Sequence, residues 1–201
     1  MLNKKIILTS LSILGLCTAA PAWAKAELNL DLGYTQESGF SGTTSNNNIN
    51  SLGGYNFNLS LLAPFSNDNI IPLLGGSLNY INVSGSKNNV NTLFSSTALE
   101  VNGGLKLKSF PFSLYGLLNL GFGIANNLSE SVGGYNNVSS VNSHTIFGGT
   151  IGGVYRLSPR VDLGLEATYN SHTMTINYFA GSSETTNFNE TSIDLALNFS
   201  L

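Results

Sequence analysis

The residues of this chain that could carry out acid–base or nucleophilic chemistry are few. Its 201 residues include eleven Asp and Glu, eight Lys and Arg, two His and one Cys. Ser171 lies beside His172, and Glu184 and Glu190 follow in the same stretch, so a serine, a histidine and a carboxylate could together hydrolyse a lipid ester. The alternative is that His172 is a solvated residue at a rim and that His144 only forms a hydrogen bond on an inner face.

Metal and cofactor sites are not indicated. The sequence contains no His-Glu-x-x-His, Cys-x-x-Cys or calcium-loop spacing. Glycine pairs at 148–149 and 152–153 lack both the lysine and the following helix of a phosphate-binding loop. We therefore expect no metal ion and no cofactor.

The overall composition excludes several classes of protein. Only 9% of the residues are charged, whereas 42% are hydrophobic. Soluble globular domains carry about 25% charged residues, and disordered chains combine low hydrophobicity with a high net charge, whereas the formal charge here is −3. Basic residues are outnumbered by acidic ones, so no patch is available to displace counterions from nucleic acid.

The first 24 residues are typical of a secretory signal peptide. Two lysines precede an apolar run over 6–20, and an Ala-Trp-Ala cleavage site ends at Ala24. Cleavage would leave a mature domain over 25–201 without cysteine. A lipid attachment at Cys17 is the rival interpretation, but the bulky Leu16 precedes it where that processing requires a small residue.

Beyond the leader, apolar residues recur at every second position, which is the period of a β-strand. Eight such segments are found, at 28–34, 55–61, 74–80, 99–107, 112–124, 147–157, 161–169 and 193–201. The polar positions between them are mostly Asn, Ser, Thr and Gly. This pattern favours an all-β fold, an eight-stranded antiparallel up-and-down transmembrane β-barrel whose apolar face contacts lipid. We expect strands of about 9 to 11 residues, the length that crosses the hydrocarbon.

The connections between these segments alternate in length. Four are long and rich in Asn, Ser, Thr and Gly, namely 36–53, 84–97, 126–143 and 170–190. Short periplasmic turns and long extracellular loops are typical of outer-membrane barrels, so we expect a three-residue turn at 158–160 and loops at the opposite end. Met174, Ile176 and Tyr178 would continue the seventh strand after a phase shift and provide a protruding sheet edge for partners.

Aromatic residues fall at both ends of the expected strands, as two girdles at the membrane interfaces require. The outer girdle is expected to contain Tyr34, Tyr55, Tyr80, Phe122, Phe147 and Tyr169. The inner girdle is expected to contain Phe65, Phe110, Phe112, Tyr155 and Phe199.

Charged residues occupy the polar, inward-facing positions of the strands. The set contains Glu27, Asp31, Glu100, Lys106, Arg156, Asp162, Glu166 and Asp194. We expect opposite charges to neutralise one another in an interior that side chains just fill. Arg156 and Asp162 should face each other, and we expect Arg156→Ala to cost about 3 to 5 kcal/mol of stability if the pair is desolvated.

Two stretches carry a family resemblance, namely 152–166 (GGVYRLSPRVDLGLE) and the segment from Pro111–Phe112 to Gly121–Gly123. The whole mature chain resembles small outer-membrane barrel proteins of the opacity-protein type. The final Ile193, Leu195, Leu197, Phe199 and Leu201 are similar to the terminal strand that the β-barrel assembly machinery recognises, although family members end in Phe rather than Leu. The resemblance implies a Gram-negative outer membrane, no cofactor, and roles in adhesion, surface antigenicity or envelope integrity.

The sequence therefore predicts a non-enzymatic surface protein of the cell outer membrane, reached by secretion to the periplasm. Its function would be surface interaction, adhesion or envelope integrity through four extracellular loops. A lipid-modifying enzyme and a narrow channel for small solutes are the alternatives. The expected partners are outer-membrane lipid and lipopolysaccharide, the assembly machinery, and a host or surface ligand, with the chain a monomer and no nucleic acid bound.

Overall fold

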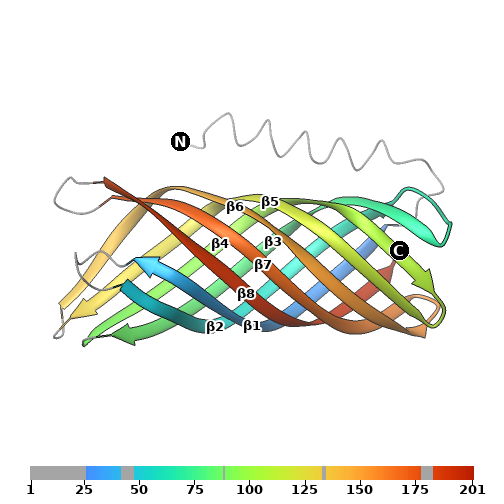
Figure 1. Ribbon diagram of the computed structural model, residues 1–201, viewed down its shortest axis with the longest axis horizontal. Coiled ribbons are helices and arrows are strands. Elements are labelled where there is room, and N and C mark those ends of the chain that lie inside the picture. The colour runs from blue at the N-terminus through green and yellow to red at the C-terminus, as the bar shows by residue number, and fades with distance from the viewer. Residues whose placement is uncertain (1–25, 42–47, 88, 133–134, 178–182) are drawn as a thin grey trace.

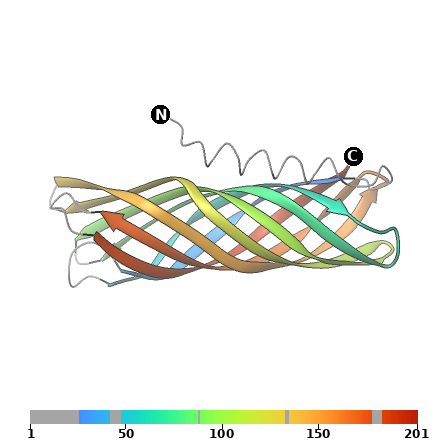
Figure 2. The ribbon, with the colours of Figure 1, turned by 90° about the horizontal axis from the view of Figure 1, so that it is seen from above.

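A computed structural model describes residues 26–41, 48–87, 89–132, 135–177 and 183–201. The proposed signal peptide over 1–24 lies outside the described residues. The eight strands of the described residues wind obliquely around one long cylinder (Figures 1 and 2). In the described ranges, no helix has both the length and the apolar character needed to span a membrane.

Each strand pairs antiparallel with the next, and the eighth strand pairs with the first, so the sheet closes into a barrel. The strands are β1 (Glu27–Ser41), β2 (Asn48–Pro64), β3 (Ile70–Lys87), β4 (Val90–Ser109), β5 (Phe112–Val132), β6 (Tyr135–Ser158), β7 (Val161–Asn177) and β8 (Ser183–Ser200). The fold class expected from the sequence is confirmed. The strands contain 15 to 24 residues, well beyond the expected length.

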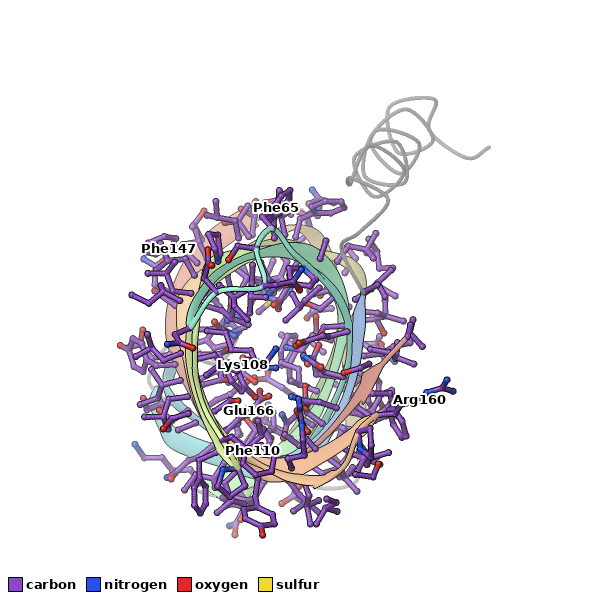
Figure 3. The ribbon with its side chains drawn as sticks, turned by 90° about the vertical axis from the view of Figure 1, so that its right-hand side faces the viewer. Phe65, Lys108, Phe110, Phe147, Arg160 and Glu166 are labelled. Atoms are coloured by element: carbon purple, nitrogen blue, oxygen red, sulfur yellow. The ribbon has the colours of Figure 1, made fainter. Side chains whose placement is uncertain are left out.

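We call the part of the barrel nearest the short turns its lower part and the opposite end its upper part. The lower part has an apolar outer face and a polar interior. Leu118 and Ile151 on the outer face are 65% and 69% exposed, whereas Asn119 and Thr150 beside them are buried. Seen along the barrel axis, Phe147 lies on the outer face and Glu166 points into the interior (Figure 3). This alternation is what a barrel wall between lipid and a closed lumen requires.

The aromatic residues expected in the two girdles lie on this outer face, whereas Phe94, Phe188 and Tyr115 point inward. Tyr34 and Tyr55 are partners in the β1–β2 register, and the rings of Tyr55 and Tyr80 lie 6.2 Å apart. At the other end, the rings of Phe112 and Tyr155 meet edge to face at 5.1 Å. Tyr34, Phe112, Phe147 and Tyr169 are each more than half exposed.

The end of the chain closes the barrel. Leu195 and Phe199 of β8 pair with Leu32 and Leu28 of β1, and the backbone N–H of Leu201 donates to the Ala26 carbonyl at 2.9 Å. Residues 189–199 of the final strand are therefore paired with both β1 and β7. Its recognition by an assembly machinery stays a prediction.

The turn between β6 and β7 is tighter than expected. Ser158 pairs with Val161 inside the ladder, and the register shifts between Arg156 and Ser158. Leu157 is therefore the extra residue of a bulge, and only residues 159–160 form the turn. The prediction of a three-residue turn was wrong because it assumed that Leu157 pairs with Val161.

The four segments expected to be long loops are mostly strand. The described strands run to residues 41, 87, 132 and 177 and resume at 48, 90, 135 and 183. We call the part of the barrel beyond the outer girdle the outer extension. It consists of residues 35–41, 48–54, 81–87, 90–98, 123–132, 135–146, 170–177 and 183–192. The loop prediction failed because Ser, Thr and Asn, common in loops, here cover the water-facing side of strands.

The outer extension has no free edge at β7. Residues up to Asn177 pair with both β6 and β8, and the β7–β8 register is continuous. Met174 and Ile176 point inward without any shift in the β7–β8 register. The strand keeps its regular alternation, but its apolar residues now occupy the inward-facing positions instead of the outward-facing ones. The expected phase shift and sheet edge were therefore wrong, and Tyr178 lies outside the described residues.

Gly104 permits a close approach between β4 and β5. A Cβ atom at this position would lie 1.9 Å from the Gly116 carbonyl oxygen, whereas one at Gly103 would meet nothing closer than the Leu74 Cδ1 at 3.6 Å. We expect Gly104→Ala to lower the free energy of unfolding by about 1 to 3 kcal/mol through overpacking, measured by urea unfolding in detergent. Gly103→Ala is the matched control, and equal urea midpoints for the two variants would contradict this account.

Candidate functional site

The interior of the outer extension contains a cluster of apolar side chains, which we call the plug, together with buried polar residues such as Glu37, Thr92 and Glu130. Its eight buried members are Leu52, Ile81, Val83, Phe94, Leu128, Met174, Ile176 and Phe188. Phe94 and Phe188 meet edge to face with ring centroids 5.6 Å apart. A buried apolar centre of this kind stabilises a barrel that stands in water, since burial removes about 25 cal/mol per Å² of apolar surface from solvent.

The outside of the same section is mostly polar, although Leu93, Ile124 and Val138 are also exposed on it. Outward-facing residues include Gln36, Ser84, Ser86, Asn91, Thr145, Thr173, Thr175, Thr185, Asn187 and Thr191. Among the described residues, this outward set contains no charged side chain. The barrel wall therefore inverts its polarity at the outer girdle, from apolar outside below it to polar outside above it. This inversion marks where the strands leave the membrane.

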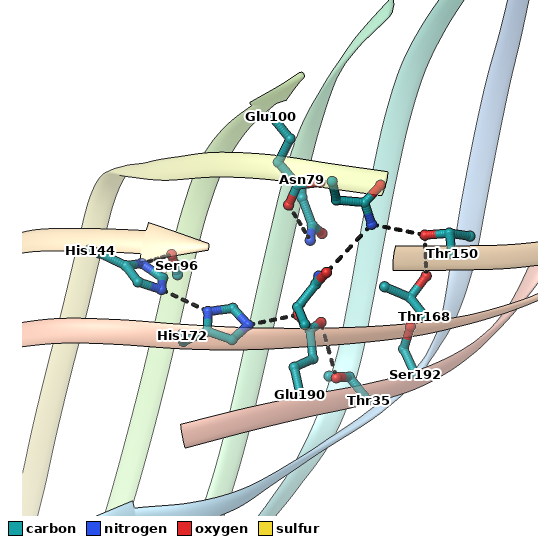
Figure 4. Close-up of polar contacts among 12 residues, drawn as sticks. Thr35, Asn79, Ser96, Glu100, His144, Thr150, Thr168, His172, Glu190 and Ser192 are labelled. Atoms are coloured by element: carbon teal, nitrogen blue, oxygen red, sulfur yellow. Dashed lines mark hydrogen bonds and ion pairs between the residues drawn. The ribbon is translucent and has the colours of Figure 1, made fainter. Parts of the chain in front are cut away.

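Two histidines lie directly beneath the plug and form a hydrogen-bonded relay (Figure 4). His144 Nε2 and His172 Nδ1 are 2.8 Å apart, and His172 Nε2 lies 3.0 Å from Glu190 Oε2. The His172 ring stacks on Phe188 at 4.6 Å. His144 and His172 are 2% and 0% exposed, and Glu190 is 1% exposed. The relay is therefore closed to bulk water.

Both ends of the relay are held by neutral side chains. Glu190 accepts hydrogen bonds from Asn170 Nδ2 at 3.1 Å and from Thr35 Oγ1 at 3.3 Å. At the other end, His144 Nδ1 lies 2.8 Å from Asn126 Oδ1 and 3.2 Å from Ser96 Oγ. With Glu190 ionised, His172 Nε2 carries a proton, so the relay links β8 to β7, β6, β5 and β4 along the inner wall.

The wall beside His144 contains a seam where β5 and β6 do not pair. Their register runs to Phe122–Thr145 and resumes only at Leu128–Ser139. The seam therefore consists of residues 123–127 of β5 and 140–144 of β6, with register shifts on its β4 and β7 sides. Asn126 of β5 contacts His144, so the relay ends beside this unpaired seam.

In the seam, some amide hydrogens of β5 and β6 point toward the facing strand. We expect these to exchange about tenfold faster than paired amides at the same level along the barrel axis. The matched reference is 81–85 and 92–96, where β3 and β4 pair without interruption. Hydrogen–deuterium exchange of the barrel in detergent, read by mass spectrometry, measures both. Equal protection of the two sites would show that the seam is closed by backbone hydrogen bonds.

Below the relay, the lumen contains a cavity of about 30 Å³, which we call the polar chamber. Its lining includes the carboxyl groups of Asp31, Glu100, Glu166, Glu190 and Asp194 together with seven asparagines. Neutral donors contact these acids: Asn56 donates to Asp194 at 2.7 Å, Asn58 to Asp31 at 2.9 Å, and Tyr115 to Glu166. Among the described residues that line the chamber, none is Lys, Arg or His.

Two ion pairs lie below the chamber, toward the turn end. Lys106 Nζ on β4 lies 2.9 and 2.8 Å from the two carboxylate oxygens of Glu27 on β1, across the lumen. Arg156 Nε contacts Asp162 Oδ1 at 3.0 Å between neighbouring strands. The eight charges expected inside all point into the lumen, but only these four form ion pairs with one another. Asp31, Glu100, Glu166 and Asp194 gather instead in the chamber, without a basic partner.

The hydrolase hypothesis built on Ser171 was wrong. Adjacent strand residues point to opposite faces, so Ser171 lies on the outer face opposite Asn189 while His172 points inward. Glu184 is exposed at the far end of β8, and only Glu190 joins His172. Ser96 does contact His144, but it is 2% exposed, which leaves no approach for an ester.

Sequence reasoning missed Glu37 and Glu130 and the inward role of Glu190, because all three fell in presumed loops. Glu190 continues the inward parity of Asp194, four residues away on β8, so extending the alternation would have found it. Among the described residues, no group of three or more His, Cys, Asp and Glu is arranged to hold a metal ion.

Comparison with solved structures finds barrels similar to this one. The Neisserial surface protein A (NspA) aligns with a TM-score of 0.56 at 16% identity, over 88% of this chain and 97% of that one. A major outer membrane protein from Thermus thermophilus aligns with a TM-score of 0.52 at 9% identity, over 87% of this chain and 99% of that one. These identities show a shared fold alone. A search of curated protein sequences found no match.

The family model described as the outer membrane protein beta-barrel domain matches residues 7–199, nearly the whole chain. The match agrees with the closed eight-stranded barrel and with its lipid-facing apolar wall. The chain therefore belongs to the outer membrane protein beta-barrel family and resides in the outer membrane.

Proposed function

We propose that this protein is a non-enzymatic surface protein that binds a partner through its outer extension. The observation that carries the proposal is the inversion of polarity at the outer girdle. Above it, a strand wall around a packed plug presents mainly Ser, Thr and Asn side chains to water, with Leu93, Ile124 and Val138 exposed among them. A rigid scaffold that projects an uncharged, hydrogen-bonding surface is suited to recognition, because little conformational entropy is lost on binding.

One face of the extension is hollowed. A shallow groove of about 410 Å³ lies over β3, β4 and β5. Its outward side chains are Ser84, Ser86, Asn91, Leu93, Ser129 and Ser131. The size is within the range of small-ligand sites, and hydroxyl and amide groups around one leucine favour a neutral, hydroxyl-bearing partner such as a glycan. We therefore infer that this groove is the binding face.

The interior argues against the two alternatives. Eight buried apolar side chains lie in the lumen of the extension, and the Lys106–Glu27 ion pair crosses the lumen near the turn end of the barrel. We therefore expect no conductance in a planar lipid bilayer. The relay lacks an accessible nucleophile, since Ser96 and His144 are both buried. We expect the mass spectrum of lipid A to be unchanged by His172→Ala.

The experiment compares the binding of intact cells to epithelial cells and to matrix glycoproteins. Cells expressing the wild type should bind more than cells without the protein. Ser84→Glu with Ser129→Glu places two charges in the groove and should abolish the difference. Thr173→Glu with Thr185→Glu adds the same charge on the opposite wall and should leave binding intact.

Surface levels must be equal in all strains, measured by antibody labelling of an epitope tag. The proposal would be overturned if cells expressing the wild type bound no better than cells lacking the protein. It would also be overturned by full binding by both double variants, because the extension would then have no binding face. Loss only in the control pair would move the site to β7 and β8.

A further inference from the structure

Glu37 on β1 is a buried acid of the outer extension that belongs neither to the relay nor to the lining of the polar chamber. It is 0% exposed, and neither oxygen of its carboxyl group has a hydrogen-bond partner in the described part of the chain. An ionised carboxylate that is buried without a partner is strongly unfavourable. Glu37 therefore has to carry a proton in the folded barrel.

The register places Glu37 between an apolar side chain and a second acid. Its partner on β2 is Leu52, a member of the plug, and its partner on β8 is Glu190. All three side chains are buried, and neighbours on the same face of paired strands have Cβ atoms about 4.5 to 5.5 Å apart. An ionised Glu37 would therefore meet apolar surface on one side and a like charge on the other.

Glu190 is the member of this pair that is ionised. His172 Nε2 lies 3.0 Å from Glu190 Oε2, and Asn170 and Thr35 donate to the same carboxylate. Burial alone would raise the pKa of Glu190, but the hydrogen bond and charge of His172 hold this pKa below its ordinary value. Burial, and then the charge of Glu190, raise the pKa of Glu37 well above its ordinary value. The two acids are therefore driven to opposite protonation states.

The other ionisable side chains of the described extension are more distant in the sheet. They are Lys87 of β3, Glu130 of β5, His144 of β6, His172 of β7 and Glu184 of β8. The first four belong to strands that do not pair with β1, and Glu184 is exposed, six residues from Glu190. Glu190 is therefore the ionisable group that the sheet sets directly beside Glu37.

We propose that Glu37 is a pH-sensitive latch of the outer extension. As a neutral acid it packs beside the plug, and β1 stays closed against β8. When it loses its proton, repulsion from Glu190 and hydration of the new charge separate β1 from β8 above the outer girdle. The membrane-spanning residues 28–34 of β1 stay paired, because lipid offers their backbone groups no other partners. The extension is thus rigid at low pH and loosens as the pH rises.

The test is urea unfolding of the purified barrel in detergent, from about pH 4 to about pH 10, near the ordinary pKa values of Glu and Lys. It compares the wild type with Glu37→Gln, which resembles the neutral acid and cannot ionise. Glu37 loses its proton at its ordinary pKa in the unfolded chain but keeps it to higher pH in the folded barrel. The stabilisation from neutral Glu37 is therefore complete at low pH and is lost as the pH rises. Relative to Glu37→Gln, the unfolding equilibrium constant of the wild type should rise about tenfold per pH unit until folded Glu37 ionises.

The matched control is Glu184→Gln, which removes an exposed acid of the same extension and should keep the pH dependence of the wild type. Glu37→Leu continues the plug to this position and should lose that dependence, which tests the latch even if Glu37→Gln does not fold. The proposal would be overturned if the ratio of the wild-type and Glu37→Gln equilibrium constants stayed constant with pH.

Hydrogen–deuterium exchange, read by mass spectrometry at equal pH, locates the change. On the alkaline side of the transition, residues 35–38 and 189–192 should exchange faster in the wild type than in Glu37→Gln. Residues 28–34 should exchange equally in both proteins. Equal exchange of 35–38 in the two proteins would overturn the latch, because the pH dependence would then not arise from opening of the extension.

Discussion

Replacing Lys106 with methionine is expected to lower the free energy of unfolding by about 3 to 5 kcal/mol. The Lys106 side chain is 1% exposed and that of Glu27 is 12% exposed. Methionine fills most of the lysine's volume but leaves the Glu27 carboxylate largely buried without its cation. The pair also joins β1 to β4 across the lumen, so its loss removes a contact between opposite walls. Urea unfolding in detergent, followed by circular dichroism, measures the change.

Two further variants separate the charge from the packing. Lys106→Met combined with Glu27→Gln removes the unpaired charge and should recover most of the lost stability, as a double-mutant cycle shows. Arg156→Met should cost only about 1 kcal/mol, because the Arg156 side chain is 29% exposed and water partly replaces its partner. This revises the larger cost expected from the sequence for Arg156. A Lys106 variant as stable as the Arg156 variant would contradict the account.

The membrane-spanning part of the fold could be predicted because lipid enforces a strict alternation. Leu118 and Leu120 face lipid while Asn119 between them faces the lumen, and a one-residue error would place every polar side chain in hydrocarbon. The parity of each strand followed from this constraint. The inward direction of Glu100, Glu166 and Asp194 followed with it.

The outer extension could not be predicted by the same rule. Above the outer girdle the solvent outside is water, so Met174 and Ile176 turn inward and Thr173 and Thr175 face outward. The strand continues, but the apolar residues change parity and become sparse. A pattern search that requires apolar residues on one constant face therefore ends the strand near Tyr169.

Contacts across the lumen could not be predicted from the sequence, for a different reason. Lys106 and Glu27 are 79 residues apart and lie on strands that do not pair. Which inward residues meet depends on the tilt and stagger of all eight strands. The relay depends on the β6–β7 register, which places His144 opposite Met174 and next to His172. Alternation gives the face of each residue but not this register.

The second large effect is expected in the plug, where Phe94→Ala should cost about 3 to 5 kcal/mol. Phe94 is 0% exposed and contacts the rings of Phe188 at 5.6 Å and His144 at 6.0 Å, both edge to face. Its removal leaves a cavity at the centre of the extension that the paired wall cannot collapse to fill. Urea unfolding followed by circular dichroism provides the measurement.

Leu93→Ala is the matched control, because Leu93 is the preceding residue of β4 and is 46% exposed on the outer face. Its stability should stay within about 0.5 kcal/mol of the wild type. Since Phe94 also supports His144, hydrogen exchange at 140–144 should rise in Phe94→Ala and not in Leu93→Ala. Equal destabilisation by the two variants would mean that the apolar interior of the extension does not hold it together, and the rigid projecting surface required for binding would lose its physical basis.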